Sequence, residues 1–214
     1  MTAVQTDKST SDDPRIGIVG LGNISYHHAD RLRDIGATLV GGVDVDADAR
    51  AQFADRFETP VFESDERLYD QDPDAVVVTT PNRFHEEYAV SALREGVNVL
   101  LEKPLAHTLD SAERIADAAH EVEPFCMTGF HTRFRSPVAV VKGRQASGYF
   151  GDVEHVEANY VRRRGVPGRG SWFTKRRVSG GGALLDIGVH AIDLALYFLD
   201  FPTVTEVTAT TRSE

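Results

Sequence analysis

The chain has 214 residues and a net charge of −10 at neutral pH, which allows one complete domain and part of a second. An acidic surface repels nucleic acid and anionic membranes, and no apolar run approaches the roughly 20 residues of a membrane span. Neither is therefore an expected partner. Residues 1–14 are polar and acidic and lack the order of a signal peptide, which predicts a disordered tail and a cytoplasmic location.

Two features of residue usage bear on habitat and redox chemistry. The chain has 4 lysines against 19 arginines and 19 aspartates, an acidic surface typical of a salt-rich cytoplasm, so we expect a halophilic protein. Cys126 is the single cysteine, which excludes an internal disulfide and a multi-cysteine zinc site. Its apolar neighbours indicate a buried thiol.

From Arg15 onward, short apolar runs alternate with amphipathic segments as far as Thr128. The run at 75–78 is continuously β-branched after Ala75, as in strands that are buried on both faces of a parallel sheet. This alternation predicts an α/β fold in which residues 15–129 form a Rossmann domain with a doubly wound parallel sheet. Strands are expected at 15–19, 38–43, 60–62, 75–78, 97–101 and 125–128, and helices at 25–35, 46–57, 64–69, 84–95 and 109–122.

The pattern changes after Gly129. Residues 153–160 alternate apolar and polar side chains, as a half-exposed antiparallel strand does, and 204–211 is expected to be another strand. Two or three strands do not form a stable sheet without covering, so residues 130–214 are predicted to be an incomplete second domain. Its other expected elements are helices at 137–147 and 183–199 and a basic, glycine-rich loop at 162–182.

A dinucleotide fingerprint follows the first expected strand. The stretch GLGNIS fits G-x-G-x-x-G/A, with Ser25 as the third small residue. Gly20 permits the tight turn, and Gly22 lets the backbone approach a pyrophosphate at the N-terminus of the following helix. Asn23 and Ile24 complete the predicted pyrophosphate-binding loop.

Asp44 ends the second expected strand, 22 residues after Gly22. A carboxylate at this place accepts hydrogen bonds from ribose hydroxyls and repels a 2′-phosphate. We therefore expect NAD in preference to NADP, which stays as the alternative cofactor. In the competing interpretation, Asp44 merely starts a turn or caps the next helix.

The carboxyl ends of parallel strands line the cofactor crevice of such a fold. Thr80, Pro81 and Asn82 follow the fourth strand and are candidate contacts to the cofactor, although Pro-Asn is equally typical of an ordinary turn. His85 lies in the next helical turn and is as compatible with a structural role as with cofactor binding.

Two further groups carry candidate chemistry. Glu102 and Lys103 end the fifth strand, where an ammonium could stabilise a developing alkoxide; a solvated lysine is the alternative. Asp186, His190 and Asp193 share one face of the helix expected at 183–199. A histidine there could act as a general base beside a carboxylate. The alternatives are a helix-capping Asp186 with a core His190, or a metal site, which the missing further ligands disfavour.

Taken together, GLGNIS, Asp44, TTPNRFH, EKP and GGGALLDIGVHAID resemble the Gfo/Idh/MocA oxidoreductases from about Arg15 to the end of the chain. The resemblance implies hydride transfer between NAD or NADP and a hydroxyl or carbonyl of a sugar, polyol or related compound. It implies that Lys103, often preceding a cis proline, contacts substrate and nicotinamide ribose, with His190 as acid/base and Asp186 beside it. It also implies an α+β second domain with an open, mainly antiparallel sheet, which often mediates oligomers.

Chains of this family are usually longer, which leaves alternatives to an active dehydrogenase. The chain could be a non-catalytic dinucleotide-binding sensor, a subunit that needs a complementing chain or a second copy, or an inactive fragment. The basic loop at 162–175 could meet an acidic or phosphorylated sugar, although a solvated loop is the simpler interpretation.

Overall fold

The computed structural model describes residues 13–161 and 171–211. The predicted N-terminal tail and most of the predicted basic loop therefore lie outside the described residues.

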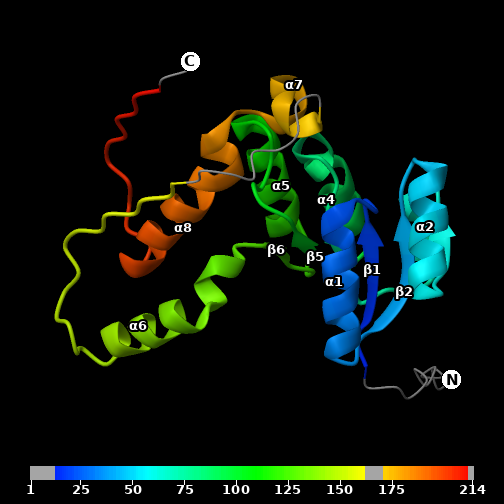
Figure 1. Ribbon diagram of the computed structural model, residues 1–214, viewed down its shortest axis with the longest axis horizontal. Helices are drawn as coiled ribbons and strands as arrows, with labels where there is room; N and C mark the ends of the chain where they lie inside the picture. The colour runs from blue at the N-terminus through cyan, green and yellow to red at the C-terminus, as the bar shows by residue number, and fades with distance from the viewer. Residues whose placement is uncertain (1–12, 162–170, 212–214) are drawn as a thin grey trace, which may run out of the picture.

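A six-stranded parallel sheet forms the centre of the first region, as the sequence predicts (Figure 1). The strand order β3-β2-β1-β4-β5-β6 reverses direction between β1 and β4, which places a crevice at the carboxyl ends of these two strands. The strands are β1 (Arg15–Val19), β2 (Thr38–Val43), β3 (Val61–Phe62), β4 (Ala75–Val78), β5 (Asn98–Leu101) and β6 (Cys126–Thr128).

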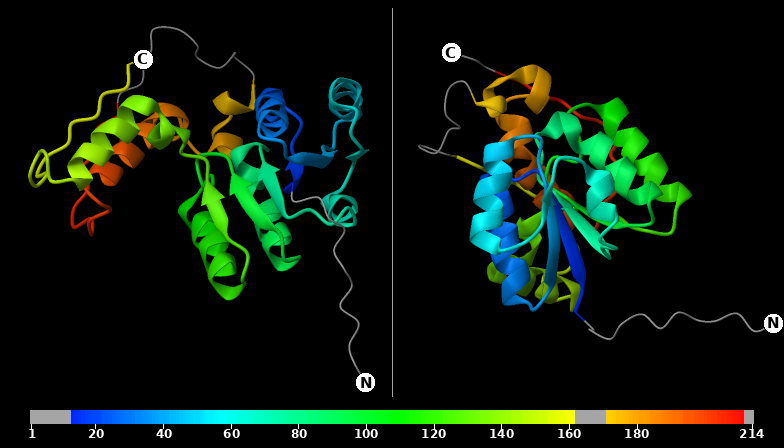
Figure 2. Two further views of the ribbon diagram at one scale, coloured as in Figure 1. Left: turned by 90° about the horizontal axis from the view of Figure 1, so that it is seen from below. Right: turned by 90° about the vertical axis from the view of Figure 1, so that its right-hand side faces the viewer.

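Helices cover both faces of the sheet (Figure 2). One apolar cluster joins Ile18 and Val77 of the sheet to Ala29 and Phe53, which lie on α1 (Asn23–Asp34) and α2 (Ala47–Phe57). A second cluster packs the other face against α3 (Asp65–Tyr69), α4 (His85–Arg94) and α5 (Leu109–Glu121). The sheet therefore has an apolar core on each side, as a doubly wound fold requires.

Glycine positions explain one packing contact between these layers and one helix end. Gly17 of β1 and Gly41 of β2 face Leu68 of α3, and a Cβ on either glycine would lie within 3 Å of the leucine side chain. The two strand glycines thus make room for a fully buried leucine. Gly96, at a φ of 81°, follows the end of α4 as predicted, because this left-handed conformation suits glycine.

The second region contains α6 (Ser136–Ala146), α7 (Arg176–Ser179) and α8 (Val189–Phe198). Shorter elements are the 3₁₀ turns η2 (His131–Phe134) and η3 (Trp172–Thr174) and the π-helical turn η4 (Leu184–Gly188). Two of the predictions for this region are wrong. Residues 153–160 and 204–211 form no strand in the structure (Figure 1). An alternating pattern becomes a strand only where a partner strand takes up its hydrogen bonds, and the described residues offer none.

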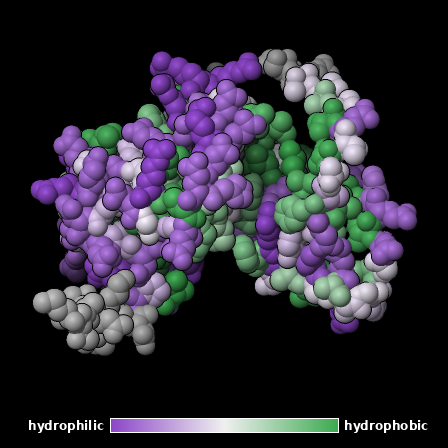
Figure 3. Space-filling view, turned by 180° about the vertical axis from the view of Figure 1, so that it is seen from behind, coloured by the Kyte–Doolittle hydropathy of each residue, from purple (hydrophilic) through white to green (hydrophobic). Residues whose placement is uncertain are grey.

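Apolar side chains stay exposed on the second region (Figure 3). The exposed group includes Val140, Tyr149, Ile192, Phe201 and Val207. By length and composition alone, the stretch Arg176–Phe198 would suffice to cross a membrane. In this structure it carries Asp186, which contacts Lys103 of the first region, and the buried His190, and we therefore describe it with the site below.

Candidate active site

The glycine loop between β1 and α1 has the shape and polarity of a cradle for an anion. Gly20 has a φ of 92°, and a Cβ there would lie 2.8 Å from the backbone nitrogen of Thr80, so the turn requires glycine. Gly22 precedes α1 without a side-chain cap, and a Cβ there would meet nothing within 4 Å. The open space before Gly22 and the amides of Asn23 and Ile24 suit an anion at the helix N-terminus.

The carboxylate of Asp44 lies beside this cradle. Its Oδ2 accepts a hydrogen bond from the backbone N–H of Leu21 at 2.7 Å, and its Oδ1 accepts one from Asp46 at 2.9 Å. Asp46, and not Asp44, caps α2. Asp44 remains partly exposed, and a carboxylate has about four acceptor sites, so it can still receive ribose hydroxyls.

The segment after β4 contacts both the glycine loop and the second region. The hydroxyl of Thr79 donates to the carbonyl of Gly20 at 2.5 Å. The hydroxyl of Thr80 is buried and has no hydrogen-bond partner among the described residues, which is costly unless a ligand supplies one. This orphaned hydroxyl beside the cradle fits a dinucleotide. The side-chain amide of Asn82 instead donates to the backbone carbonyl of Ser179 at 2.9 Å. Pro81, between Thr80 and Asn82 in the chain, is half-buried.

His85 holds two loops together. Its Nδ1 lies 2.9 Å from the carbonyl oxygen of Pro104, and its Nε2 lies 3.0 Å from that of Thr80. The ring is fully buried, and burial lowers its pKa even though the two carbonyls favour the charged form. Of the two interpretations that the sequence leaves open, this geometry favours the structural one.

Glu102 connects β5 to α1. Its Oε1 lies 2.8 Å from Nε2 of His28, and its Oε2 accepts a hydrogen bond from the backbone N–H of Lys103 at 3.2 Å. Burial raises the pKa of Glu102, but the hydrogen bond to His28 and the charges of His28 and Lys103 outweigh it, so the pKa is lowered. The carboxylate is thus ionised and turned toward the helix that carries the glycine cradle. Nothing in the sequence pattern singles out His28.

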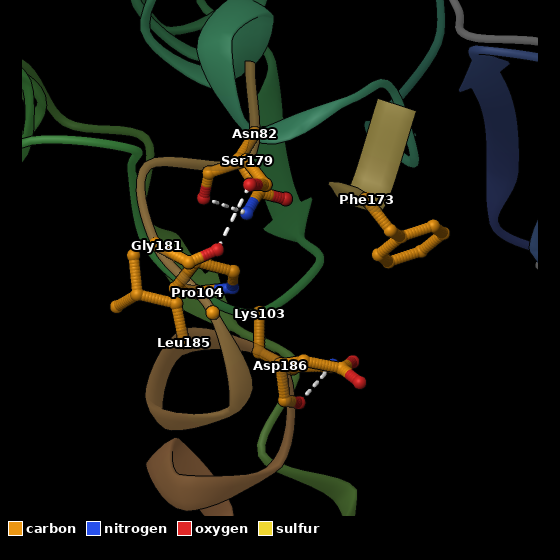
Figure 4. Close-up of a pocket in the computed structure, with 9 residues that line it drawn as sticks. Asn82, Lys103, Pro104, Phe173, Ser179, Gly181, Leu185 and Asp186 are labelled. Atoms are coloured by element: carbon orange, nitrogen blue, oxygen red, sulfur yellow. Dashed lines mark hydrogen bonds and ion pairs between the residues drawn. The ribbon is translucent and has the colours of Figure 1, made fainter. Parts of the chain in front are cut away.

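Lys103 reaches from β5 to the second region (Figure 4). The Lys103–Pro104 bond is cis, which confirms the expectation from the resemblance. The ammonium donates to the backbone carbonyl of Asp186 at 2.6 Å and lies 3.4 Å from its carboxylate Oδ1. Both side chains line a small pocket that is open to solvent. The lining residues are Asn82, Lys103, Pro104, Phe173, Ser179, Gly181, Gly182, Leu185 and Asp186.

The helix predicted at 183–199 is not a continuous α-helix. It opens with the π-helical turn Leu184–Gly188, and α8 follows. A Cβ at Gly188 would lie 2.8 Å from Cδ1 of Leu184, so glycine permits this wider turn. The predicted α-helix is therefore wrong for residues 184–188, which include Asp186, whereas His190 and Asp193 lie three residues apart in α8 and share one face of it. Asp186 faces Lys103, as an ion-pair partner.

His190 lies at the start of α8 with 7% of its surface exposed. Its ring meets the ring of His131 edge to face at 4.9 Å between centroids, and its Nδ1 lies 3.5 Å from the hydroxyl of Thr132. Burial lowers the pKa of His190, the positive charges of Lys103 and His131 lower it further, and Glu102 and Asp193 oppose them. The imidazole is therefore neutral near pH 7 and able to accept a proton.

The segment that surrounds this imidazole was not among the predicted site residues. His131, Thr132 and Arg133 follow β6 directly, and Arg133 forms an ion pair with Asp193 through both carboxylate oxygens. Residues at the carboxyl ends of β4 and β5 were predicted as site residues because of that position. The same rule, applied to β6, would have predicted these three residues.

Comparison with known proteins identifies the family of this fold. The model of an oxidoreductase family with an NAD-binding Rossmann fold matches residues 14–130, and that of the GFO/IDH/MocA C-terminal domain matches residues 138–214. The chain belongs to the Gfo/Idh/MocA family of oxidoreductases. Its first region is an NAD-binding Rossmann domain, which confirms the predicted fold.

The relatives of this family member include sugar dehydrogenases. D-glucoside 3-dehydrogenase of Escherichia coli is 40% identical over 64% of this chain and 39% of its own length. Glucose-6-phosphate 3-dehydrogenase of Bacillus subtilis is 30% identical over 90% of this chain and 55% of its own length. A structure of levoglucosan dehydrogenase with NADH has a TM-score of 0.73 and 25% identity, covering 88% of this chain and 54% of that one. The chain thus spans about half the length, or less, of these relatives.

Proposed function

We propose that this chain binds NAD in the glycine cradle and transfers hydride between the nicotinamide and a CH–OH group of a sugar or polyol. The observation that carries the proposal is the ion pair of Lys103 with Asp186 beyond the end of β5, with the buried His190 on the helix that follows Asp186 and the glycine loop after β1. Bound NAD would supply the hydride acceptor. The sugar dehydrogenases among the relatives support a carbohydrate substrate.

Each of the three residues of the site has a separate role in the reaction. His190 accepts the proton of the substrate hydroxyl, because its lowered pKa keeps the imidazole neutral. The ammonium of Lys103 stabilises the developing alkoxide, and Asp186 holds that ammonium at the pocket. In the reverse direction, the imidazolium returns the proton to the carbonyl oxygen.

The preference for NAD over NADP rests on Asp44. Its partly exposed carboxylate would receive the ribose hydroxyls and repel a 2′-phosphate. Arg50 lies close by, but its guanidinium donates to the backbone carbonyl of Asp44 at 2.6 Å. Calorimetric titration with NADH and NADPH should give the lower Kd for NADH; a lower Kd for NADPH would contradict this preference.

Turnover tests the catalytic roles. Against a panel of glucosides, glucose 6-phosphate, anhydrosugars and inositols, Lys103→Ala and His190→Asn should each lower kcat by about 10²–10³-fold, the usual loss of a charge-stabilising or acid/base group. The Kd for NADH should stay within about twofold in both variants. Lys142→Ala is the matched control, because Lys142 bonds Asp200 and Tyr197 away from the site. Near-normal turnover of either site variant would remove the assigned roles.

A second candidate function follows from the exposed second region. Residues 153–160 and 204–211 pair with no strand of the described chain, and apolar side chains of α6 and α8 are exposed. Both features suit a subunit completed by a second copy or by a complementing chain, whose strands would add to these stretches. NADH binding without turnover, together with an oligomer or a tight complex in light scattering, would favour it. A monomer with full turnover would exclude it.

We also propose a cytoplasmic, salt-adapted protein, supported by the acidic, lysine-poor composition. Salt titration of NADH binding tests the second part: binding should weaken at low salt, and full affinity there would contradict it.

A further inference from the structure

A turn directly after β6 surrounds the buried imidazole of His190. The centroid of the Phe130 ring lies 6.4 Å from that of His190 at an interplanar angle of 84°, and the ring of His131 lies closer, at 4.9 Å and 70°. The Thr132 hydroxyl lies 3.5 Å from Nδ1, a long contact of the kind that tightens when a site closes on its ligands. Three consecutive residues thus define the plane of the ring and the environment of one nitrogen.

The next residue fixes this turn to α8. Nε of Arg133 donates to the two carboxylate oxygens of Asp193 at 3.0 and 2.9 Å, and Nη2 donates to Oδ1 as well. The Asp193 side chain is 3% exposed, and the guanidinium also lies over the rings of Phe130, Tyr197 and Phe201. A forked, largely buried ion pair allows little variation in geometry. Since Asp193 follows His190 by three residues on the same helix, the pair sets the position of Thr132 relative to the imidazole.

We propose that Thr132 is a positioning residue that holds His190 in its Nδ1–H tautomer, and that the Arg133–Asp193 pair keeps Thr132 in place. Nδ1–H donates to the hydroxyl oxygen of Thr132, which leaves the lone pair of Nε2 directed away from the turn. The consequence of this tautomer for turnover rests on the proposed function, since only an unprotonated Nε2 can accept a proton from a substrate hydroxyl. The tautomer itself does not depend on that function.

Long-range ¹H–¹⁵N NMR of the histidine-labelled full chain at pH 7.5 tests the tautomer, with His190→Asn used to assign the His190 signals by their loss. The wild-type protein should show His190 with a protonated Nδ1. Thr132→Val, which removes the hydroxyl but keeps the shape, should move the ring toward the Nε2–H form, and Thr132→Ser should keep the wild-type pattern. Thr38→Val is the matched control, because Thr38 is exposed at the start of β2. A wild-type Nε2–H tautomer, or an unchanged pattern in Thr132→Val, would overturn the proposal.

Kinetics test the consequence. Thr132→Val should lower kcat by about tenfold or more with an unchanged Kd for NADH, and Thr132→Ser should recover most of it, because acid/base groups act only in the correct protonation state. Absence of turnover in the wild-type protein would count against the proposed function alone, since the NMR result still decides the tautomer. A changed tautomer without a change in kcat would instead remove the positioning role.

Discussion

The two regions of the chain differ in what they bury. In residues 15–128 the interior is mainly apolar, and every buried hydrophobic side chain of the described residues lies between Ile18 and Ala118. In the described part of residues 129–211, the buried side chains are those of Ser179, His190 and Asp193, all of them polar. The first region is therefore organised by the hydrophobic effect, and the second by the polar contacts of the site.

This difference shows how the second region is held in place. Its anchors to the first are the hydrogen bond from Asn82 to the carbonyl of Ser179 and the contacts of Lys103 with Asp186. A region without an apolar core of its own depends on such bonds, so the residues that build the pocket also attach the region. Site and attachment are then lost together, while the glycine cradle of the first region survives.

The largest expected effect is the difference in stability loss between a buried side chain of the first region and an exposed side chain of the second. Phe53→Ala removes a fully buried ring that packs against Phe57 at 4.6 Å between centroids, and should lower the free energy of unfolding by about 3–5 kcal/mol. Val140→Ala shortens a side chain that is 65% exposed on α6 and should change the free energy of unfolding by about 0.5 kcal/mol or less. Urea unfolding followed by circular dichroism measures both. Similar losses in the two variants would mean that Val140 is covered in solution and would remove the contrast.

The next effect tests the polar organisation of the second region. Asp193→Ala leaves the Arg133 guanidinium without its buried partner and should weaken local protection of α8 by about 3–5 kcal/mol. Asp200→Ala breaks an ion pair whose carboxylate side is 75% exposed, and should cost about 1 kcal/mol or less. Hydrogen exchange of α8 amides measures both, and NADH affinity should change in neither. Loss of NADH binding in Asp193→Ala would show that the regions are not separable.

The smallest effect concerns pH, because each region buries a histidine. Burial lowers the pKa of both His85 and His190. Below the unfolded value of about 6.5, the unfolded chain binds more protons than the folded one, so stability falls as the pH drops from there through the lowered folded pKa values. The melting temperature should therefore decrease between pH 7.5 and 5, and His85→Gln should reduce that slope. A slope unchanged by His85→Gln would mean that folding does not lower the pKa of His85.

The sheet was largely predictable, and the second region was not. The predicted limits of β1, β2 and β4 agree with the structure, because a β-branched or apolar run that is buried on both faces has one favourable conformation. The alternation at 153–160 predicted a strand with equal clarity, yet a half-exposed strand needs a partner that local sequence cannot supply.

The site shows the same division. Gly20, Asp44 and Lys103 could be found from the sequence, since each follows a strand and the carboxyl ends of parallel strands meet at one edge. His28 could not, because its importance comes from Glu102, which is distant in the chain. Thr132 was missed because the rule for strand ends was not applied to β6. The π turn that contains Asp186 could not be predicted either, because it is not visible in helical spacing.

The sequence by itself determined the parallel sheet, the pyrophosphate cradle and the strand ends that carry the chemistry, because these follow from local periodicity and from glycine positions. The tertiary structure decided which side chains meet. It placed the ammonium of Lys103 on Asp186, enclosed the imidazole of His190 within the turn after β6, and left two expected strands without partners. Those outcomes depend on contacts between segments far apart in the chain, and the free energy of such contacts cannot be inferred from a local sequence pattern.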